Sequence, residues 1–563
     1  MGHFSSAASA TVAPLPAPDA VQNHKSSIDA KEQEKHQSIE QDGEDETEPV
    51  LKPRKSLAFY LAFAGLSLLL LVFQMDATCL SIALPTIASE LKGTSLESFW
   101  ANLSYSLCGL VMQPVWASTS DAFGRKYPLQ TSVVLFFVVS IVFAIAKEMK
   151  TIIAGRALQG LGGGGIDVLV TMVLANMTTL EERSKYLGLM AIATAVGNIM
   201  GPFVGALFST YASWRWTGWI NLPLLGVGAI LLFFFLRLRD VPLGTTLASN
   251  LNRLDWIGMP LVIVGITLFT ISISWAGSLF SWASWETLLP LLLGIATLVV
   301  FIWYEPKPAA PIVPLRLFET KTGNMALIGG FIHGIILISL LQYLPLMYQS
   351  VHVKTAIASA VYLLPATILS LFITVVSMML VPVFGGYVWL LRSSWVIATL
   401  GTGLLALYHT QSSPAMLHGL PILWGQGVSL LRLLMLPIQA SVKNVNDEGL
   451  ASANSITIRM FGALIGLAIC SPIFNNVFSN SISNVAVDLM GPLAPLKDAS
   501  NAINFISELK SLNLPPATLD QVSHLYLNSF KAIFYTMTAL SGLGLITSLF
   551  LDEIELKRKE RGN

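Results

Sequence analysis

The sequence predicts an all-α polytopic membrane protein with about fourteen spanning helices, and three observations lead to this fold class. Of the 563 residues, 53% are hydrophobic and only 12% are charged, whereas a soluble domain carries roughly 25% charged residues. Many apolar runs reach the ~20 residues that a spanning helix needs. Runs such as 67–73 and 229–236 show no alternation of polar and apolar residues, which excludes a membrane β-barrel, the other fold that satisfies its backbone in lipid.

Clusters of charged and turn-forming residues divide the chain into its expected spans. The turn Phe384-Gly385-Gly386 separates the tenth span from the eleventh. We expect spanning helices at 58–84, 98–118, 128–147, 150–175, 186–210, 215–236, 256–276, 287–304, 324–347, 356–382, 388–409, 417–440, 451–474 and 529–551.

The charges of the connecting loops orient these spans, because cytosolic loops carry an excess of lysine and arginine. If the N-terminus is cytosolic, the inner loops hold most of these residues, from Lys52 to the basic C-terminal tail 552–563. If one span were miscounted, every later loop would change sides and the excess of lysine and arginine would appear outside. The excess instead stays on the inner side up to the last loop. We therefore expect both termini in the cytosol.

Two polar regions stand apart from the spans. Residues 1–55 are rich in Ala, Ser, Gln and charged residues, and we expect a disordered cytosolic tail there. Residues 475–528 form a long outer loop, in which 502–512 predict a short amphipathic helix. Asn102 lies in an Asn-Leu-Ser sequon near the outer end of the second span; it is a candidate for glycosylation, but it lies so close to the membrane that we expect it to be unmodified.

A charged side chain at membrane depth costs about 2.5–3.5 kcal/mol on insertion scales, so each one needs a partner or a function. Asp76 lies deep in the first span. A carboxylate there takes up a proton more readily than in water, which suits proton coupling; the alternative is a carboxylate that caps a helix or pairs internally. The other polar candidates for a substrate cavity are Gln74, Gln159, Asn198, His333, Gln342, Tyr343, Gln426, Arg432 and Arg459.

The fourth span carries two further charges, Arg156 and Asp167. They are eleven residues apart, so they lie on nearly the same helix face but roughly 16 Å apart along the axis. They cannot pair with each other, and each must find a partner on another helix or in a water-filled cavity. Asp167 is a second candidate proton site. The glycine run 160–165 between them predicts close helix packing rather than a dinucleotide site, because it follows no strand.

Two more segments suggest how parts of the protein could move. Residues 120–126, Ser-Asp-Ala-Phe-Gly-Arg-Lys, form a basic turn after the second span, in which Asp121 can cap a helix or pair with Arg125 as a breakable cytosolic latch. In the fifth span, 197–205 combine three glycines with Pro202, which predicts a bendable, closely packed helix.

These strings together resemble the major facilitator superfamily, in particular its fungal fourteen-span drug:proton antiporters. QMDATCLSIALPTIA, SDAFGRK, GRALQGLGGGG and GNIMGPFVGALF carry the resemblance in that order, and WRWTGWINLP and SITIRMFGALIGLAI reinforce it. The resemblance covers residues 57–551.

The resemblance implies two six-helix halves, 56–240 and 323–551, with two inserted helices and linkers in 241–322. The halves would rock about a midplane site in alternating access. It assigns Asp76 to the family's span-one signature and Arg156 to its proton-relay motif. It places Asp121, Gly124, Arg125 and Lys126 in the gating loop, and Gly197, Gly201, Pro202 and Gly205 in the antiporter motif.

The chain departs from the family pattern at four positions. Ala117 and Ala206 stand where the family usually has glycine, and Asn176 stands where it usually has aspartate. Asp167 replaces a usually apolar residue. These departures put ordinary coupling in doubt, and Asp167 could take over part of the charge role.

The leading functional hypothesis is a proton-coupled antiporter that exports a small lipophilic drug, toxin or metabolite, driven by the proton gradient without a cofactor or metal. We expect a monomer in the lipid bilayer of the plasma membrane, or alternatively of the vacuole, with a small-molecule substrate and no nucleic-acid partner. A carrier of basic amino acids or siderophores is the alternative; cationic cargo would favour more carboxylates than Asp76 and Asp167. No metalloprotease, paired-aspartate or Ser-His-Asp motif appears, so we do not expect an enzyme.

Overall fold

The computed structural model describes residues 55–238, 247–276, 280–444, 447–484, 491–509, 512 and 514–556. Nearly all of the expected N-terminal tail, the linker at 239–246 and the end of the basic C-terminal tail therefore lie outside the described residues. Every described helix belongs to the compact unit of residues 57–563.

Three successive sets of helices follow one another along the chain. The first set is α2 (Leu57–Glu90), α3 (Ser95–Phe123), α4 (Lys126–Ala144), α5 (Met149–Met177), α6 (Leu180–Tyr211), the one-turn α7 (Trp216–Trp219) and α8 (Asn221–Phe235). The second is α9 (Leu247–Leu251), α10 (Gly258–Trp275), α11 (Trp285–Tyr304) and the 3-10 turn η2 (Leu315–Phe318). The third is α12 (Lys321–Val351), α13 (Ala356–Phe384), α14 (Val388–Leu404), η3 (Leu405–Leu407), α15 (Pro414–Leu430), η4 (Leu431–Leu434), α16 (Met435–Ala440), α17 (Glu448–Asn484), η6 (Gly491–Lys497), η7 (Ala499–Asn501), α18 (Ala502–Leu509) and α19 (Pro516–Leu549).

Among the described residues, twelve helices are long and apolar enough to cross a membrane. The two other expected spans, 98–118 and 417–440, are also helical. The first is α3, which is not among the twelve, and the second is divided into α15, η4 and α16. An integral, multi-pass helical protein is therefore confirmed, whereas the number fourteen stays a prediction.

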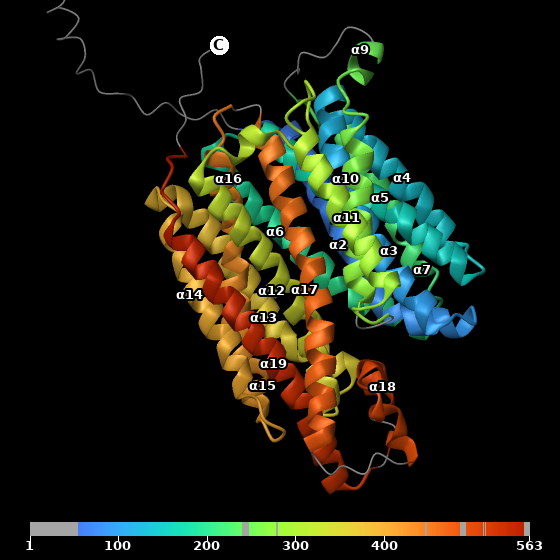
Figure 1. The fold of residues 1–563 in the computed structure, drawn as a ribbon. Coiled ribbons are helices and arrows are strands. Elements are labelled where there is room, and N and C mark those ends of the chain that lie inside the picture. Colours follow the sequence, from blue (N-terminus) through green and yellow to red (C-terminus); the bar gives the residue numbers. More distant parts are fainter. Residues whose placement is uncertain are drawn as a thin grey trace, which may run out of the picture. The chain divides into compact units, whose positions relative to one another are not determined.

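The helices pack chiefly within the first and third sets. In the first, α2 packs on α6 and α8, and α5 packs on α3 and α4; in the third, α12 packs on α17 and α19, and α15 packs on α13 and α14. Figure 1 shows the first set in blue and teal and the third in yellow to red. The two sets meet where α6 contacts α13 and where α17 contacts α3 and α5. The inserted helix α10 lies against α3 and α17, and α11 lies on α10.

Glycines let the backbones of α2 and α6 touch. Gly197, Gly201 and Gly205 lie four residues apart, so they share one face of α6. A β-carbon at any of the three would overlap a backbone carbonyl oxygen of α2; for Gly205 this is the oxygen of Cys79. The expected close packing of the fifth span is therefore present, and small residues at these positions make it possible.

The third set uses the same device. Gly334 of α12 lies against the backbone of Arg459, and Gly462 of α17 lies against the backbone of Phe331. The α12–α17 contact thus repeats the packing principle of α2–α6.

Two smaller sequence predictions are also confirmed. The α13 helix ends at the expected turn, where Gly385 adopts a left-handed conformation with φ of 68° and its N–H donates to Val381 O at 3.0 Å, a conformation that glycine adopts without steric cost. The short helix expected at 502–512 is α18 (Ala502–Leu509).

Replacing Gly205 by alanine tests the α2–α6 contact. The added methyl group must push two backbones apart, so we expect the variant to lose about 1–3 kcal/mol of stability, measured as a lower melting temperature in detergent. Gly226→Ala on α8 is the matched control, because no atom lies within 4 Å of the added β-carbon. Equal melting temperatures for the two variants would contradict the packing described here.

Candidate functional site

A buried ion pair lies in the middle of the first helix set. Arg156 Nη1 of α5 lies 2.6 Å from Asp76 Oδ2 of α2, and the two side chains are 1% and 7% exposed. Arg156 thus finds on another helix the partner that its depth in the membrane requires. Because both charges are buried, each depends on the other for its stability.

Neutral polar side chains also surround the Asp76 carboxylate. Asn221 Nδ2, at the start of α8, donates to Asp76 Oδ1 at 2.7 Å, and Gln159 Nε2 donates to the same oxygen at 3.2 Å. Gln159 also donates to Ser140 Oγ of α4 at 3.1 Å and accepts from Arg156 at 3.0 Å. We call Asp76, Arg156, Gln159, Asn221 and Ser140 the charge cluster. It joins α2, α4, α5 and α8.

Aromatic packing fixes the Arg156 guanidinium on its other side. Its central carbon lies 4.1 Å from the ring centroid of Tyr105 on α3, a cation–π contact. The Tyr105 hydroxyl donates to Phe73 O at 3.3 Å. Arg156 Nε and Nη2 have no hydrogen-bond partner among the described residues. These two nitrogen atoms, which carry three N–H groups, therefore remain available for a water molecule, a substrate or a rearranged partner.

Asp167 lies outside the charge cluster. Gln113 Nε2 of α3 donates to Asp167 Oδ2 at 3.0 Å, and both residues are buried. The structure thus gives Arg156 and Asp167 separate partners.

A second set of charges ties the first helix set to the third. Arg183, near the start of α6, lies 2.8 Å from Glu448 Oε2 at the start of α17. It also donates to Gln439 Oε1 of α16 at 3.3 Å and to the carbonyl of Ala175 at 2.7 Å. The pair is 2% and 6% exposed. These contacts hold α5, α6, α16 and α17 together at one end of the helices.

The expected gating loop lies at this same end. Asp121 and Arg125 form an ion pair, as the sequence suggested, and Arg125 Nη1 donates to Ser120 Oγ at 2.5 Å. The guanidinium of Arg125 also lies against Gly449 of α17. Burial raises the pKa of Asp121, and the Arg125 charge opposes that shift. The gating loop therefore touches the first turn of α17.

One further pair strengthens the contact. Arg316 of η2 forms a two-pronged ion pair with Asp447, at 2.6 and 2.9 Å, and these hydrogen bonds raise the pKa of Arg316. We call the pairs Arg183–Glu448, Asp121–Arg125 and Arg316–Asp447 the latch, and the end that carries them the latch end.

Most of the other sequence candidates do not join either cluster. Lys126 donates to the carbonyl of Phe233 at 2.8 Å, and Gly124 ends α3 with φ of 81°. His333 and Tyr343 are buried. The side chain of Arg432 lies outside the described residues. The remaining candidates are half-buried or exposed: Gln74, Asn198, Gln342, Gln426 and Arg459, with the sequon residue Asn102 exposed.

Sequence analysis missed Asn221, Arg183 and Glu448 as site residues. Asn221 lies in the string WRWTGWINLP, which gave a signal for the family but not for a contact with Asp76. Arg183 and Glu448 lie between expected spans, where sequence analysis used only lysine and arginine, to orient the chain, although the structure places both in the first turns of helices. A polar residue at the first turn of an apolar helix is the signal that could have identified Asn221 and Glu448.

A buried carboxyl group lies in the segment between α11 and η2. Glu305 follows α11, is 2% exposed, and accepts the Val313 N–H at 2.5 Å. Its Oε2 has no hydrogen-bond partner among the described residues. Burial raises the pKa of Glu305 to about 7, helped by the nearby Asp255. Glu305 therefore takes up a proton at a higher pH than an exposed glutamate does.

Within the described part of the chain, no three His, Cys, Asp or Glu side chains are grouped so as to hold a metal ion. The family model of the Major Facilitator Superfamily matches residues 66–469. The chain belongs to the major facilitator superfamily. It is a membrane transporter rather than an enzyme.

Similar proteins agree with this membership. The chain is 67% identical over 524 residues to the MFS-type transporter sphD of Aspergillus fumigatus, covering 93% of this chain and 90% of that one. It is 31% identical over 509 residues to the efflux pump FUS6 of Gibberella moniliformis, covering 90% and 89%. Its fold resembles the human organic anion transporter MFSD10 (TETRAN), with a TM-score of 0.53 at 16% identity, covering 88% of this chain and 100% of that one. This last likeness supports the major facilitator fold alone.

Removing one member of the buried ion pair should cost more stability than removing both. Arg156→Gln leaves the Asp76 carboxylate without its cation, which costs about 3–5 kcal/mol. The double variant Asp76→Asn, Arg156→Gln leaves no buried charge there, so we expect it to melt at a higher temperature than Arg156→Gln alone. If the stability loss of the double variant equalled the sum of the losses of Asp76→Asn and Arg156→Gln, the two residues would not be coupled.

Glu305 should make stability depend on pH. Its pKa rises from the ordinary 4.5 to about 7 on folding, so between these values the folded state binds more protons than the unfolded state. The free energy of unfolding contributed by this group therefore falls as pH rises from about 4.5 to 7. We expect Glu305→Gln to flatten the fall in melting temperature across this range. Glu319→Gln is the control, since that carboxylate is exposed and paired with Lys443; an unchanged slope in Glu305→Gln would contradict the assignment.

Proposed function

We propose that this transporter is a proton-coupled antiporter that exports small lipophilic molecules by alternating access. The observation that carries the proposal is the buried Asp76–Arg156 pair. A carboxylate held by one cation in an apolar helix bundle has two states of very different electrostatic energy, paired and protonated. That property is what coupling to a proton gradient requires.

Proton transfer to Asp76 would release Arg156. The neutral acid no longer attracts the guanidinium, whose unpartnered Nε and Nη2 then compete for other acceptors. Asn221 and Gln159 would keep hydrogen bonds to the protonated acid, because an amide can both donate and accept. The change is therefore local in chemistry but affects α2, α4, α5 and α8, which all contribute to the charge cluster.

Protonation of Asp76 would act on the latch, which can be formed or separated. We infer from the loop charges that the latch end faces the cytosol. With the Arg183–Glu448 pair formed at 2.8 Å, the first and third helix sets are held together there. Opening towards the cytosol requires this buried pair to separate, and opening towards the outside allows it to persist. A proton on Asp76 would shift the balance between these two states.

Two observations support export of lipophilic cargo. The relative FUS6, at 31% identity, is named an efflux pump. Among the buried aromatic residues of the third helix set, Tyr343 packs on Phe530 with ring centroids 6.4 Å apart, and the Trp424 indole N–H lacks a hydrogen-bond partner among the described residues. Such surroundings suit apolar molecules that carry few polar groups. We place the protein in the plasma membrane as a monomer, both termini in the cytosol.

Asp76→Asn tests the proposal in sealed inside-out vesicles with an acidic lumen. Wild-type vesicles should accumulate a lipophilic fluorescent dye such as Nile red or rhodamine 6G, and a protonophore should abolish the accumulation. The variant cannot exchange a proton at position 76, so its uptake should fall to the level seen with the protonophore. Asp167→Asn is the matched control on the competing carboxylate. If uptake by Asp76→Asn still followed the pH gradient, proton coupling would not depend on Asp76. If only Asp167→Asn lost this uptake, the coupling would be assigned to Asp167.

A further inference from the structure

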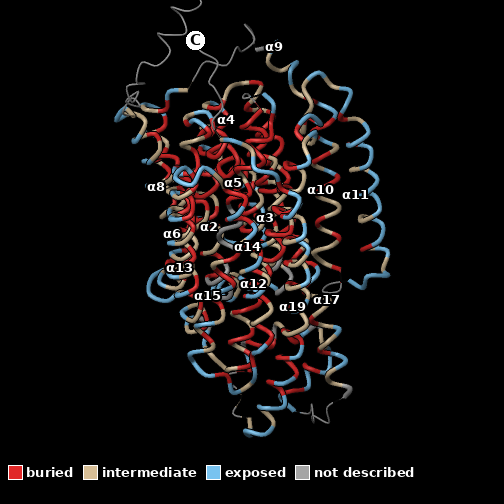
Figure 2. Tube along the Cα trace, turned by 90° about the vertical axis from the view of Figure 1, so that its left-hand side faces the viewer, coloured by how far each residue is buried: buried red, intermediate tan, exposed pale blue. Residues whose placement is uncertain are grey.

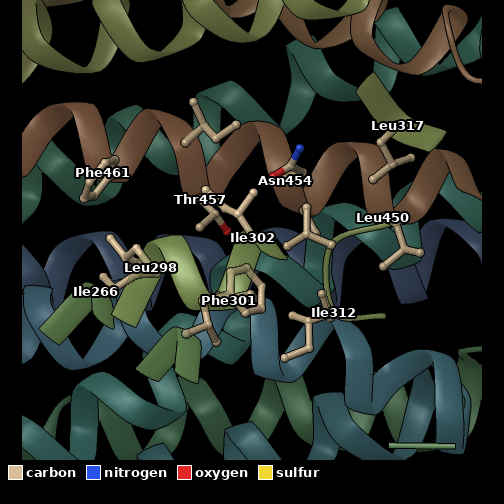
Figure 3. Close-up of a pocket in the computed structure, with 16 residues that line it drawn as sticks. Ile266, Leu298, Phe301, Ile302, Ile312, Leu317, Leu450, Asn454, Thr457 and Phe461 are labelled. Carbon is tan, nitrogen blue, oxygen red and sulfur yellow. The ribbon is translucent and has the colours of Figure 1, made fainter. Parts of the chain in front are cut away.

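A pocket of about 240 Å³ lies beneath the inserted α10–α11 hairpin, away from the charge cluster. Figure 3 shows sixteen residues that line it. They come from α3, α10, α11, the segment around η2 and the first half of α17. Since α3 belongs to the first helix set and α17 to the third, an occupant would touch both.

The lining is almost wholly apolar. Phe301, Phe461 and aliphatic residues such as Ile266 and Leu298 make up most of it, and no charged side chain is among the sixteen. The two amide or hydroxyl groups are Asn454 and Thr457, three residues apart on α17, and Figure 3 shows the Thr457 hydroxyl on the side of the helix that faces Ile302 of α11. A ligand that fits this lining is a hydrocarbon with few polar groups.

One residue that lines the pocket also reaches the outer face of α11. Ile302 lines the pocket and is still 62% exposed. Its neighbours Val299 and Val300 are 59% and 47% exposed, and Figure 2 shows much of α11 in the colour of exposed residues. In a spanning helix, exposed aliphatic side chains face lipid tails. The entrance therefore opens to the hydrocarbon core of the membrane rather than to water.

The dimensions favour a chain over a compact molecule. A volume of 240 Å³ is below the roughly 300–1,000 Å³ of sites that enclose a whole drug-sized ligand. The lining on α17 runs from Leu450 to Phe461, which is roughly 16 Å of helix axis. An apolar space of this kind loses contacts when it is empty, and water cannot fill it without polar partners.

We propose that this pocket binds one unbranched hydrocarbon chain that enters sideways from the bilayer, with Asn454 and Thr457 offering hydrogen bonds to a hydroxyl or ester group on it. The chain belongs either to a membrane lipid or to a lipophilic molecule dissolved in the membrane. The binding site does not depend on proton coupling or on export.

Photochemical labelling of the full-length protein in nanodiscs tests the proposal. One sample contains a phosphatidylcholine with a diazirine in its acyl chain, and a second contains a free long-chain alcohol with the same group. After irradiation, mass spectrometry should find labels on the α17 peptide around 450–461 and on the α11 peptide around 298–302. Label in the first sample that the unlabelled alcohol displaces indicates an exchangeable site, whereas label that it does not displace indicates a resident lipid; both support the site.

Ile302→Trp fills the pocket from the lipid side and should reduce the label on α17 by about fivefold or more. Val299→Trp is the matched control, because it is equally exposed on the same helix but does not line the pocket. Should Ile302→Trp fail to fold, Ala453→Leu fills the same space from α17. Absence of label on 450–461, or label that the filling variant leaves unchanged, would overturn the proposal. Labelling is read without a gradient, so its outcome is independent of the transport assays.

Discussion

The arrangement of the first helix set depends on the Asp76–Arg156 ion pair. Two charges lie at 2.6 Å in the interior of a helix bundle, where an unpaired charge is strongly unfavourable. Helices α5 and α8 supply the groups that surround the carboxylate, Ser140 of α4 holds Gln159, and the Tyr105 ring of α3 covers the guanidinium. The close α2–α6 packing through Gly197, Gly201 and Gly205 fixes the backbone of α2 on the opposite flank, which limits how far Asp76 can move.

The fold was largely predictable from the sequence because membrane depth imposes a strong pattern. Apolar runs of about twenty residues, the loop charges and the glycines at i, i+4, i+8 follow from the bilayer's thickness, its charge asymmetry and close helix contact. The number of spans was harder to predict. The α3 helix carries too many polar residues to stand out by hydropathy, and a 3-10 turn interrupts the run from α15 to α16.

The two charged residues of the charge cluster were predictable one by one, but their pairing was not. Asp76 and Arg156 were each identified by the cost of burying a charge, yet eighty positions separate them, and only the fold brings them together. The latch shows the same limit more strongly, since Arg183 and Glu448 are 265 positions apart. In the sequence each is only a charged residue between two spans. A charge that faces water and a charge that forms a buried ion pair look the same there. Tertiary pairing, unlike helix formation, leaves no local periodicity to read.

The charge cluster and the latch share α5, since this helix carries Arg156, its Ala175 carbonyl accepts from Arg183, and it packs on α17. Spin-label distances between positions 127 and 389 of the protein in nanodiscs test this link directly. Tyr127 and Trp389 are exposed at helix starts that we place on the cytosolic side. If protonation of Asp76 controls the latch, the wild-type distance distribution shifts between pH 8 and pH 5, and Asp76→Asn shows the low-pH distribution at both. The same pH-dependent shift in Asp76→Asn as in the wild type would contradict it.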